Sequence, residues 1–359
     1  MGTIRESVTA HDQTEKWAAG WATAGAAAWA VVALLAGIGR LRIGVVELLF
    51  LFAPLVIVPL GMELKRRDDS SRASVLHDAA RNLQPLGALL AVLAMYLPAG
   101  ITAGSAALGW MAVCSCAALA SVFELSGKVR RWHASSEHSS RLSGILADLA
   151  RMDLAVGGAW FVASRFGMRP LGIQEPIGLL TAVHFHYAGF ATAMIASAMV
   201  ANPMVGCPTS RRFCEKWEPA HWSIASPTLR FAGNRALWLR RTALLIAVLP
   251  FVVAAGFVIS PLLKTSAVVL FSFSGAVLAI FMWKLSGAMQ DSTARVLARI
   301  SATTVLGGMF LSATYAVSDF LGSDALTIPR MATIHGMLNA FGFSLLGLLA
   351  WLIEFAPEQ

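Results

Sequence analysis

Apolar segments of about twenty residues recur along the whole chain, and they constrain its fold more than any other feature. A helix rises 1.5 Å per residue, so a segment of about twenty residues crosses the roughly 30 Å hydrocarbon core of a bilayer. Of the 359 residues, 57% are apolar and only 13% are charged, about half the charged fraction of an ordinary soluble domain. The pattern predicts an all-α integral membrane protein. It excludes secreted modules, disordered tails and nucleic-acid binders.

We expect a polytopic bundle of about ten transmembrane helices. Two of the ten are the weakest by sequence: 83–99 contains Pro85 and Pro98, and 142–164 contains several charged residues. No cleavable signal peptide is expected, because residues 1–16 contain charged side chains and have no apolar core of their own. The predicted spans are 17–39, 43–62, 83–99, 101–123, 142–164, 177–200, 242–263, 266–288, 297–318 and 331–355.

The basic residues predict the orientation of the bundle. With ten spans, both termini and the loops after even-numbered spans share one side, and 21 of the 28 Lys and Arg residues fall on it. Short basic loops stay cytoplasmic, so we expect both termini in the cytoplasm of a multi-pass protein of the cell membrane. The net charge of +8 then reflects insertion and attraction to anionic lipid headgroups. We expect no nucleic-acid partner.

This topology divides the chain into five parts. The long loop interleaves tryptophan with arginine, a composition that is typical of a segment lying in the headgroup layer. The five parts are a cytoplasmic arm (1–16), helices one to six (17–200), a basic and aromatic interfacial loop (201–241), helices seven to ten (242–355) and a short tail (356–359).

Polar and ionisable residues inside the apolar spans are the candidates for function. On insertion scales each such charge costs about 2.5–3.5 kcal/mol, so these residues usually face a cavity or a partner. In the predicted topology most of them lie in the outer half of the membrane, which favours one cavity near the outer leaflet. The candidates are Glu47, Asp148, Arg151, Asp153, His184, His186, Tyr187, Tyr315, His335 and Asn339.

Helical spacing predicts which of these residues share a face. His184 and Tyr187 are three residues apart and share one, whereas His186 points roughly the opposite way. His335 and Asn339 are four apart and also share a face. Asp148 and Arg151, three apart, are most simply explained as a neutralising ion pair within one helix. Asp153 has no such partner in its own helix, so it is the acid that we expect to be functional.

Two short blocks carry a resemblance to a known family. Residues 184–190, His-Phe-His-Tyr-Ala-Gly-Phe, and residues 335–343, His-Gly-Met-Leu-Asn-Ala-Phe-Gly-Phe, resemble blocks of the YndJ-like integral membrane proteins. The resemblance covers about the last half of the chain and implies a polytopic membrane fold. A weaker similarity to the bacterial membrane-bound cyclases of indole sesquiterpenoids implies terpene cyclisation, although the chain has no aspartate-rich terpene-cyclase motif.

Acid–base chemistry on a lipophilic isoprenoid substrate is the preferred function. Protonation of an alkene or an epoxide starts a carbocation cascade, which makes the protein a terpene cyclase, an isomerase of natural-product biosynthesis. Asp153 suits the role of the Brønsted acid. The base or the proton relay could be His184 with Tyr187, or His335 with Asn339. His186 and Glu47 complete the catalytic candidates. Aromatic side chains would line the pocket and stabilise the cation: Trp110, Trp160, Phe185, Phe190, Phe310, Tyr315 and Phe341.

Two alternatives remain open at this stage. The histidines His184, His186 and His335, with Asp153 or Glu47, could form a metal site, but an i, i+2 histidine pair diverges on a helix. We therefore expect no metal and no cofactor. A proton-coupled transporter of a small molecule is the second alternative, because embedded acids and histidines also suit a carrier. A carrier needs polar groups across the whole thickness, whereas an enzyme needs one pocket.

The orientation can be tested directly. A reporter that is active only in the cytoplasm, fused after Gln359, is expected to be active, because most of the basic residues lie on the side of the termini. The same reporter fused in the loop between the first two spans serves as the control and should be silent. Activity in the reverse pattern would contradict the predicted topology.

Overall fold

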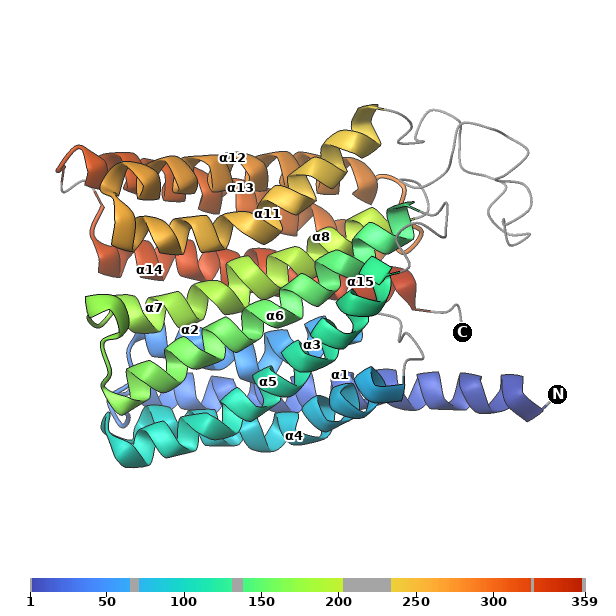
Figure 1. Ribbon diagram of the computed structural model, residues 1–359, viewed down its shortest axis with the longest axis horizontal. Helices are drawn as coiled ribbons and strands as arrows, with labels where there is room; N and C mark the ends of the chain where they lie inside the picture. The colour runs from blue at the N-terminus through green and yellow to red at the C-terminus, as the bar shows by residue number, and fades with distance from the viewer. Residues whose placement is uncertain (1, 65–70, 131–137, 203–233, 324–325, 357–359) are drawn as a thin grey trace.

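The chain folds as one bundle of helices. The computed structural model describes residues 2–64, 71–130, 138–202, 234–323 and 326–356. Within these ranges every regular element is helical, and the long helices run side by side with roughly parallel axes (Figure 1). The predicted all-α membrane fold is confirmed. The protein is a multi-pass membrane protein.

The described residues form ten helical passes, one at each predicted span. Eight of the passes are long and apolar enough to cross a membrane, and the other two, α4 and α6, are the two that the sequence marks as weakest. The passes are α1 (Gly2–Gly37), α2–η1–α3 (Val45–Glu63), α4 (Ser71–Tyr96), α5 (Ile101–Arg130), α6 (His138–Phe166), α7–η3–α8 (Ile177–Ala201), α11 (Asn234–Ile259), α12 (Pro261–Ser286), α13 (Ser292–Phe320) and α14–η5–α15 (Ile328–Phe355).

Several helices extend past the predicted ends. Helix α4 starts at Ser71 rather than near residue 83, and Pro85 lies inside it. Helix α1 includes most of the predicted arm 1–16, and α11 includes the last part of the predicted loop 201–241. Hydropathy marks where a helix leaves the hydrocarbon, but backbone hydrogen bonding continues beyond that point. The central part of that loop, 203–233, lies outside the described residues.

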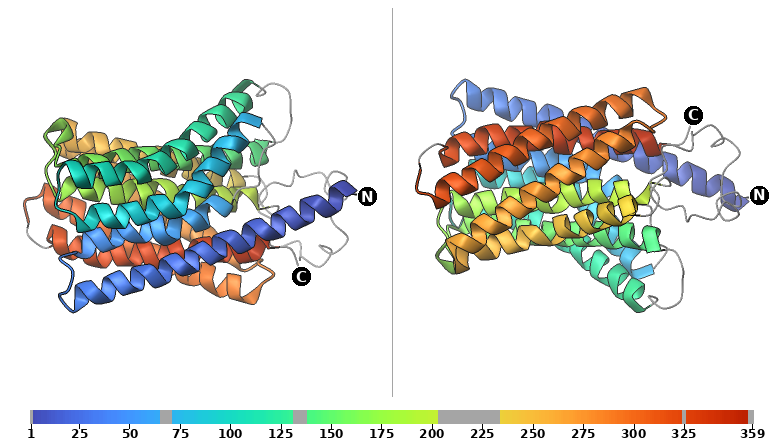
Figure 2. Two further views of the ribbon diagram at one scale, coloured as in Figure 1. Left: turned by 90° about the horizontal axis from the view of Figure 1, so that it is seen from below. Right: turned by 90° about the horizontal axis from the view of Figure 1, so that it is seen from above.

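The two ends of the chain lie on the same side of the bundle. The Gly2 end of α1 and the Phe355 end of α15 are found at one end of the helices in every view (Figures 1 and 2). An even number of passes requires this arrangement. That this end is cytoplasmic stays a prediction from the basic loops.

Three of the passes are interrupted by π-helical segments. These are η1 (Ala53–Ile57), η3 (Phe185–Ala191) and η5 (Leu338–Leu345), and each of them contacts the other two. π-Helical turns are rare and occur frequently at functional sites. Their meeting point therefore marks the part of the bundle where a site is expected.

Each π-helical segment has a backbone carbonyl that accepts a hydrogen bond from a polar side chain. In η1 and η5 the side chain comes from a neighbouring pass, and in η3 it comes from the same pass. Thr192 donates to the Tyr187 carbonyl at 2.9 Å, and Ser301 donates to the Phe343 carbonyl at 2.8 Å. In η1 the Pro54 carbonyl accepts from the Gln84 amide at 2.6 Å. Because the hydrocarbon core holds no water, such carbonyls need a partner within the protein.

Pro54 shows the need most clearly. A π-type bond to its carbonyl would come from residue 59, but that residue is a proline and has no N–H group. The N–H group of Val58 bonds instead to the Ala53 carbonyl. The buried Gln84 side chain of α4 therefore supplies a donor that the backbone of this pass lacks.

Replacing this donor is expected to destabilise the fold. The substitution Gln84→Met should lower the free energy of unfolding by about 1–3 kcal/mol, because it leaves a buried carbonyl without its side-chain partner. The matched control is Gln290→Met at an exposed position, which should have almost no effect. Reversible unfolding of both variants in detergent micelles measures the difference, and equal stabilities would refute this role of Gln84.

Candidate functional site

Asp153 is a buried acid with no polar partner. Its side chain is 1% exposed, and neither carboxyl oxygen has a hydrogen-bond partner among the described residues. It lies on α6 opposite Gly189 of η3, where a Cβ atom would stand 2.8 Å from Oδ2. Only a glycine at this position allows η3 to pack directly over the carboxyl group.

His186 lies about one helical turn away on the same interface. It is fully buried, and it packs against Gly157 of α6, where a Cβ atom would stand 2.6 Å from its Nδ1. Since α6 and η3 run in opposite directions, Asp153 with Gly189 and His186 with Gly157 form two reciprocal contacts. The interface thus places an acid and an imidazole on adjoining turns.

Both ring nitrogens of His186 are used in hydrogen bonds. Trp110 donates its indole N–H to Nε2 at 3.0 Å, and Nδ1 donates to the Ala182 carbonyl at 2.8 Å. An indole nitrogen only donates and a carbonyl only accepts, so these partners set the neutral tautomer with the proton on Nδ1. No lone pair of this imidazole remains for a metal or a substrate.

Aromatic rings surround this imidazole. Phe50 meets the His186 ring edge-on with the centroids 5.2 Å apart, and it stacks on Phe161 at 4.2 Å. Trp110, which the sequence suggested as a pocket wall, stacks on His186 at 5.9 Å. Phe50 and Phe161 were missed, because nothing in a single sequence separates them from ordinary core residues.

His184 and His335 differ from His186 in their hydrogen bonds. Nδ1 of His184 bonds to the Leu180 carbonyl at 2.7 Å, and Nδ1 of His335 bonds to the Gly308 carbonyl of α13 at 2.9 Å. Asn339 donates to the backbone carbonyl of His335 at 2.7 Å, which steadies this turn. Within the described part of the chain, Nε2 of neither imidazole has a partner.

His184 and His335 lie on separate passes, and Leu49 of α2 contacts both of these passes. The Tyr187 hydroxyl donates to the Leu49 carbonyl at 2.8 Å, while the Leu49 side chain occupies the space beside Gly336. Tyr187, which helical spacing places on the same face as His184, is therefore directed toward α2.

The histidines do not assemble as one metal site. The predicted set of His184, His186 and His335 is divided, because His186 faces Trp110 on α5, His335 bonds to Gly308 on α13, and His184 bonds to Leu180 of its own helix. In the ranges that the structure describes, no group of three His, Cys, Asp or Glu side chains is placed to hold a metal ion. Glu47, half-buried at the start of α2, joins no such group.

Several aromatic residues suggested as pocket walls lie elsewhere. Phe310 is 73% exposed on the outer face of α13, so its predicted place inside a pocket is wrong. Phe185 packs against Phe251 of α11. Others serve as packing residues or lie near the bundle surface: Phe190 beside Gly61, Trp160 against the core, and Tyr315 half-buried on α13. Phe341 packs against Trp29 and Phe52, and it also lines a groove.

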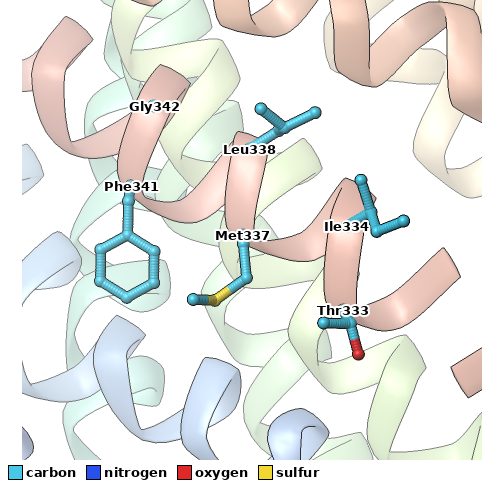
Figure 3. Close-up of a pocket in the computed structure, with 6 residues that line it drawn as sticks. All are labelled: Thr333, Ile334, Met337, Leu338, Phe341 and Gly342. Atoms are coloured by element: carbon cyan, nitrogen blue, oxygen red, sulfur yellow. The ribbon is translucent and has the colours of Figure 1, made fainter. Parts of the chain in front are cut away.

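An apolar groove runs along the outer side of α14 and η5. Figure 3 shows the side chains of Met337 and Phe341 on one flank and that of Leu338 on the other. His335 is turned away from this groove, because its Nδ1 bonds to Gly308 on α13. The groove is thus a mostly apolar depression whose lining does not include His335. Its lining residues are Thr333, Ile334, Met337, Leu338, Phe341 and Gly342.

A cluster of buried ion pairs occupies the half of the bundle nearer the termini. The predicted pair of Asp148 and Arg151 is present at 3.2 Å, and Lys128 of α5 approaches Asp148 to 2.7 Å. Glu124 lies 3.4 Å from Lys128 and 2.9 Å from His77 of α4. Hydropathy missed Glu124, Lys128 and His77, because they lie outside or at the edge of the predicted spans.

Comparison with known proteins places the chain among membrane proteins. A sequence profile described as YndJ-like protein matches residues 48–343. The chain is 28% identical over 313 residues to the uncharacterized membrane protein YndJ of Bacillus subtilis (strain 168), an alignment that covers 87% of this chain and 49% of that protein. It therefore spans about half the length of this relative. No solved structure matches it.

The ion-pair cluster predicts a large effect on stability. Asp148→Asn should lower the free energy of unfolding by about 3–5 kcal/mol, because it leaves Lys128 and Arg151 buried with less negative charge. Adding Lys128→Met to the same variant removes one of the two cations and should restore much of the loss. Thermal unfolding of the single and double variants measures both effects, and an unchanged Asp148→Asn protein would refute the structural role.

Proposed function

Because this chain belongs to the YndJ-like protein family, which by itself indicates only a membrane protein, we propose its function from the site. The protein is a membrane-embedded enzyme that uses acid–base chemistry on a lipophilic, isoprenoid-type substrate. The best fit is a terpene cyclase that protonates an alkene or an epoxide and so starts a carbocation cyclisation.

The unpartnered carboxyl group of Asp153 is the observation that carries the proposal. Neither a cation nor a hydrogen-bond donor among the described residues compensates it, and an ionised carboxylate without compensation is costly to bury. The neutral acid is therefore the favoured form, which is the form that can deliver a proton. A structural role alone gives no reason to keep an aspartate where a leucine would pack at lower cost.

The surroundings of Asp153 suit a cationic intermediate. Phe50 and Trp110 contact the ring of His186, about one turn along the same interface, and Phe161, eight residues beyond Asp153 on α6, stacks on Phe50. Aromatic faces attract a positive charge. In the proposed reaction the acid proton adds to the substrate, π electrons close new carbon–carbon bonds, and the final cation loses a proton to a base. The product is an isomer of the substrate, so the reaction consumes no co-reactant.

Substrate access requires a movement of η3. Gly189 lies directly over the carboxyl group, so the substrate reaches Asp153 only when this segment shifts. A π-helical turn is suited to such a shift, because its hydrogen bonds are less regular than those of an α-helix and such turns often occur at functional sites.

A proton-coupled transporter remains the second candidate, and a specific observation favours it. Titratable groups lie along much of the length of the bundle: Glu124 and Asp148 toward the termini, Asp153 farther along, and His184 with His335 toward the opposite half. Three interrupted helices in mutual contact also resemble the broken helices of carriers. A carrier would redistribute its substrate across a membrane without changing it chemically.

Substitution of the acid tests the enzyme proposal. Asp153→Asn keeps the shape of the side chain but cannot deliver a proton, so we expect normal expression with turnover reduced by about 10²–10⁴-fold. Asp153→Glu should retain part of the activity. The measurement incubates membranes with candidate prenylated alkenes and epoxides and detects cyclised isomers of unchanged mass.

The second aspartate of the same helix provides the matched control. Asp148→Asn should lower stability while the protein that remains folded keeps its turnover per molecule. Full activity of Asp153→Asn would remove the acid assignment. Redistribution of unchanged substrate across proteoliposomes, with no isomer formed, would favour the transporter.

A further inference from the structure

We propose that the groove along α14 and η5 binds one acyl chain of an anionic phospholipid, and that Arg330 binds the headgroup of the same lipid. The first turns of α14 lie at the end of the bundle opposite the chain termini (Figure 1), so the lipid belongs to the leaflet on that side. The inference is independent of the proposed reaction, because the lining of the groove includes neither Asp153 nor any of the histidines.

Arg330 lies on the same face of the helix as the groove. Three of the residues that line the groove follow it by four, seven and eleven positions: Ile334, Met337 and Phe341. These spacings form one continuous stripe along a helix. Arg330 is therefore placed one turn beyond the groove, toward the end of α14, where its long side chain can reach the headgroup layer.

The charge of Arg330 is available to a ligand. The residue is exposed, and no carboxylate among the described residues pairs with it. Lys264, on the same side of the bundle, differs in pairing with Asp319 at 2.6 Å. Since 21 of the 28 Lys and Arg residues fall on the opposite side, Arg330 is not part of the predicted insertion signal. An exposed guanidinium at headgroup depth attracts an anionic phosphate.

The dimensions and the lining of the groove suit a hydrocarbon chain. The lining residues extend from Thr333 to Gly342, which is about 14 Å along a helix and close to the roughly 15 Å depth of one leaflet. The Thr333 hydroxyl donates to the Pro329 carbonyl at 2.9 Å, so its hydrogen bonding is satisfied within the helix. The groove therefore offers apolar contacts along the length that an acyl chain occupies in that leaflet.

The shape of this face favours a lipid chain over a second transmembrane helix. Helices that pack closely in membranes usually meet at small residues. Here Ile334 is 48% exposed and Met337 is 44% exposed, and both side chains project from the helix (Figure 3). They would hold the backbone of a second helix at a distance, whereas a flexible chain can lie between them.

Native mass spectrometry of the full chain in detergent micelles tests the headgroup contact. The two probes are dioleoyl phosphatidylglycerol, which is anionic, and dioleoyl phosphatidylcholine, which has no net charge. We expect the wild type to bind one molecule of the anionic lipid about fivefold more tightly. Arg330→Gln should lose this preference and Arg330→Lys should retain it. The matched control is Arg169→Gln, which is also exposed on the same side and should keep the preference.

A second substitution tests the groove. At Gly307 of α13 the nearest atom to an added Cβ is Leu338 Cδ1, at 3.8 Å, so Gly307→Leu fits without a clash and fills space beside the groove. It should weaken the binding of both lipids by about tenfold, the effect of losing about 50–60 Å² of apolar contact. Thermal unfolding should be unchanged. Gly20→Leu, also in open space, is the matched control and should bind both lipids normally.

Several outcomes would overturn the inference. Equal binding of the two lipids by the wild type, or a preference that survives Arg330→Gln, would remove the headgroup contact. Unchanged binding in Gly307→Leu, or displacement of the lipid by glycerol 3-phosphate, would remove the acyl chain from the groove.

Two other occupants of the groove can be recognised in the same experiment. Farnesol that displaces the lipid and no longer binds to Gly307→Leu would assign the groove to an isoprenoid. A wild-type dimer that Gly307→Leu converts to a monomer would assign it to a second copy of the chain. Either result would overturn the inference. Selective lipid binding by a protein that forms no cyclised product would refute the proposed enzyme and leave this inference standing.

Discussion

Backbone hydrogen bonding inside the hydrocarbon core is the constraint on which the rest of this structure depends. A regular helix satisfies its own carbonyl groups, but the π-helical interruptions at the centre of the bundle do so less completely. Gln84 reaches across from α4 to the Pro54 carbonyl, because Pro59 has no N–H group to offer. Ser301 bonds in the same way to the Phe343 carbonyl. Cross-links of this kind join α4 and α13 to the interrupted passes and allow π-helical turns to exist at membrane depth.

Helix α6 shows two ways of burying an aspartate. Asp148 faces α5, where Lys128 and Arg151 compensate its charge. Asp153, five residues further along, faces η3, where it packs against Gly189 and has no hydrogen-bond partner among the described residues. The difference follows from helical geometry, since five residues turn a side chain away from one neighbouring helix and toward another. A paired charge stabilises the contact between two helices. An unpaired buried acid lowers the stability of the fold, so a catalytic role explains its presence better than a structural role does.

The histidines illustrate how far spacing alone can be used. The two-residue separation of His184 and His186 predicts that they diverge, and they do: His184 is exposed, whereas His186 is buried against Trp110. Spacing does not show that Trp110 and a backbone carbonyl use both nitrogens of His186, nor that His184 and His335 each keep one nitrogen free. Two of these partners lie far away in the chain: Trp110 is 76 residues from His186, and Gly308 is 27 residues from His335.

The sequence by itself determined the membrane fold, the positions of the passes and the absence of an ion-pair partner for Asp153 within its own helix, because hydropathy and helical periodicity are local properties that each segment carries with it. Only the tertiary structure decided that Glu124 and Lys128 join the ion pair of Asp148, that Phe310 faces outward and that Gly189 covers Asp153. The physical reason is that the direction of a side chain is set by its own helix, whereas its burial, charge compensation and free hydrogen-bonding groups are set by whichever helix packs against it.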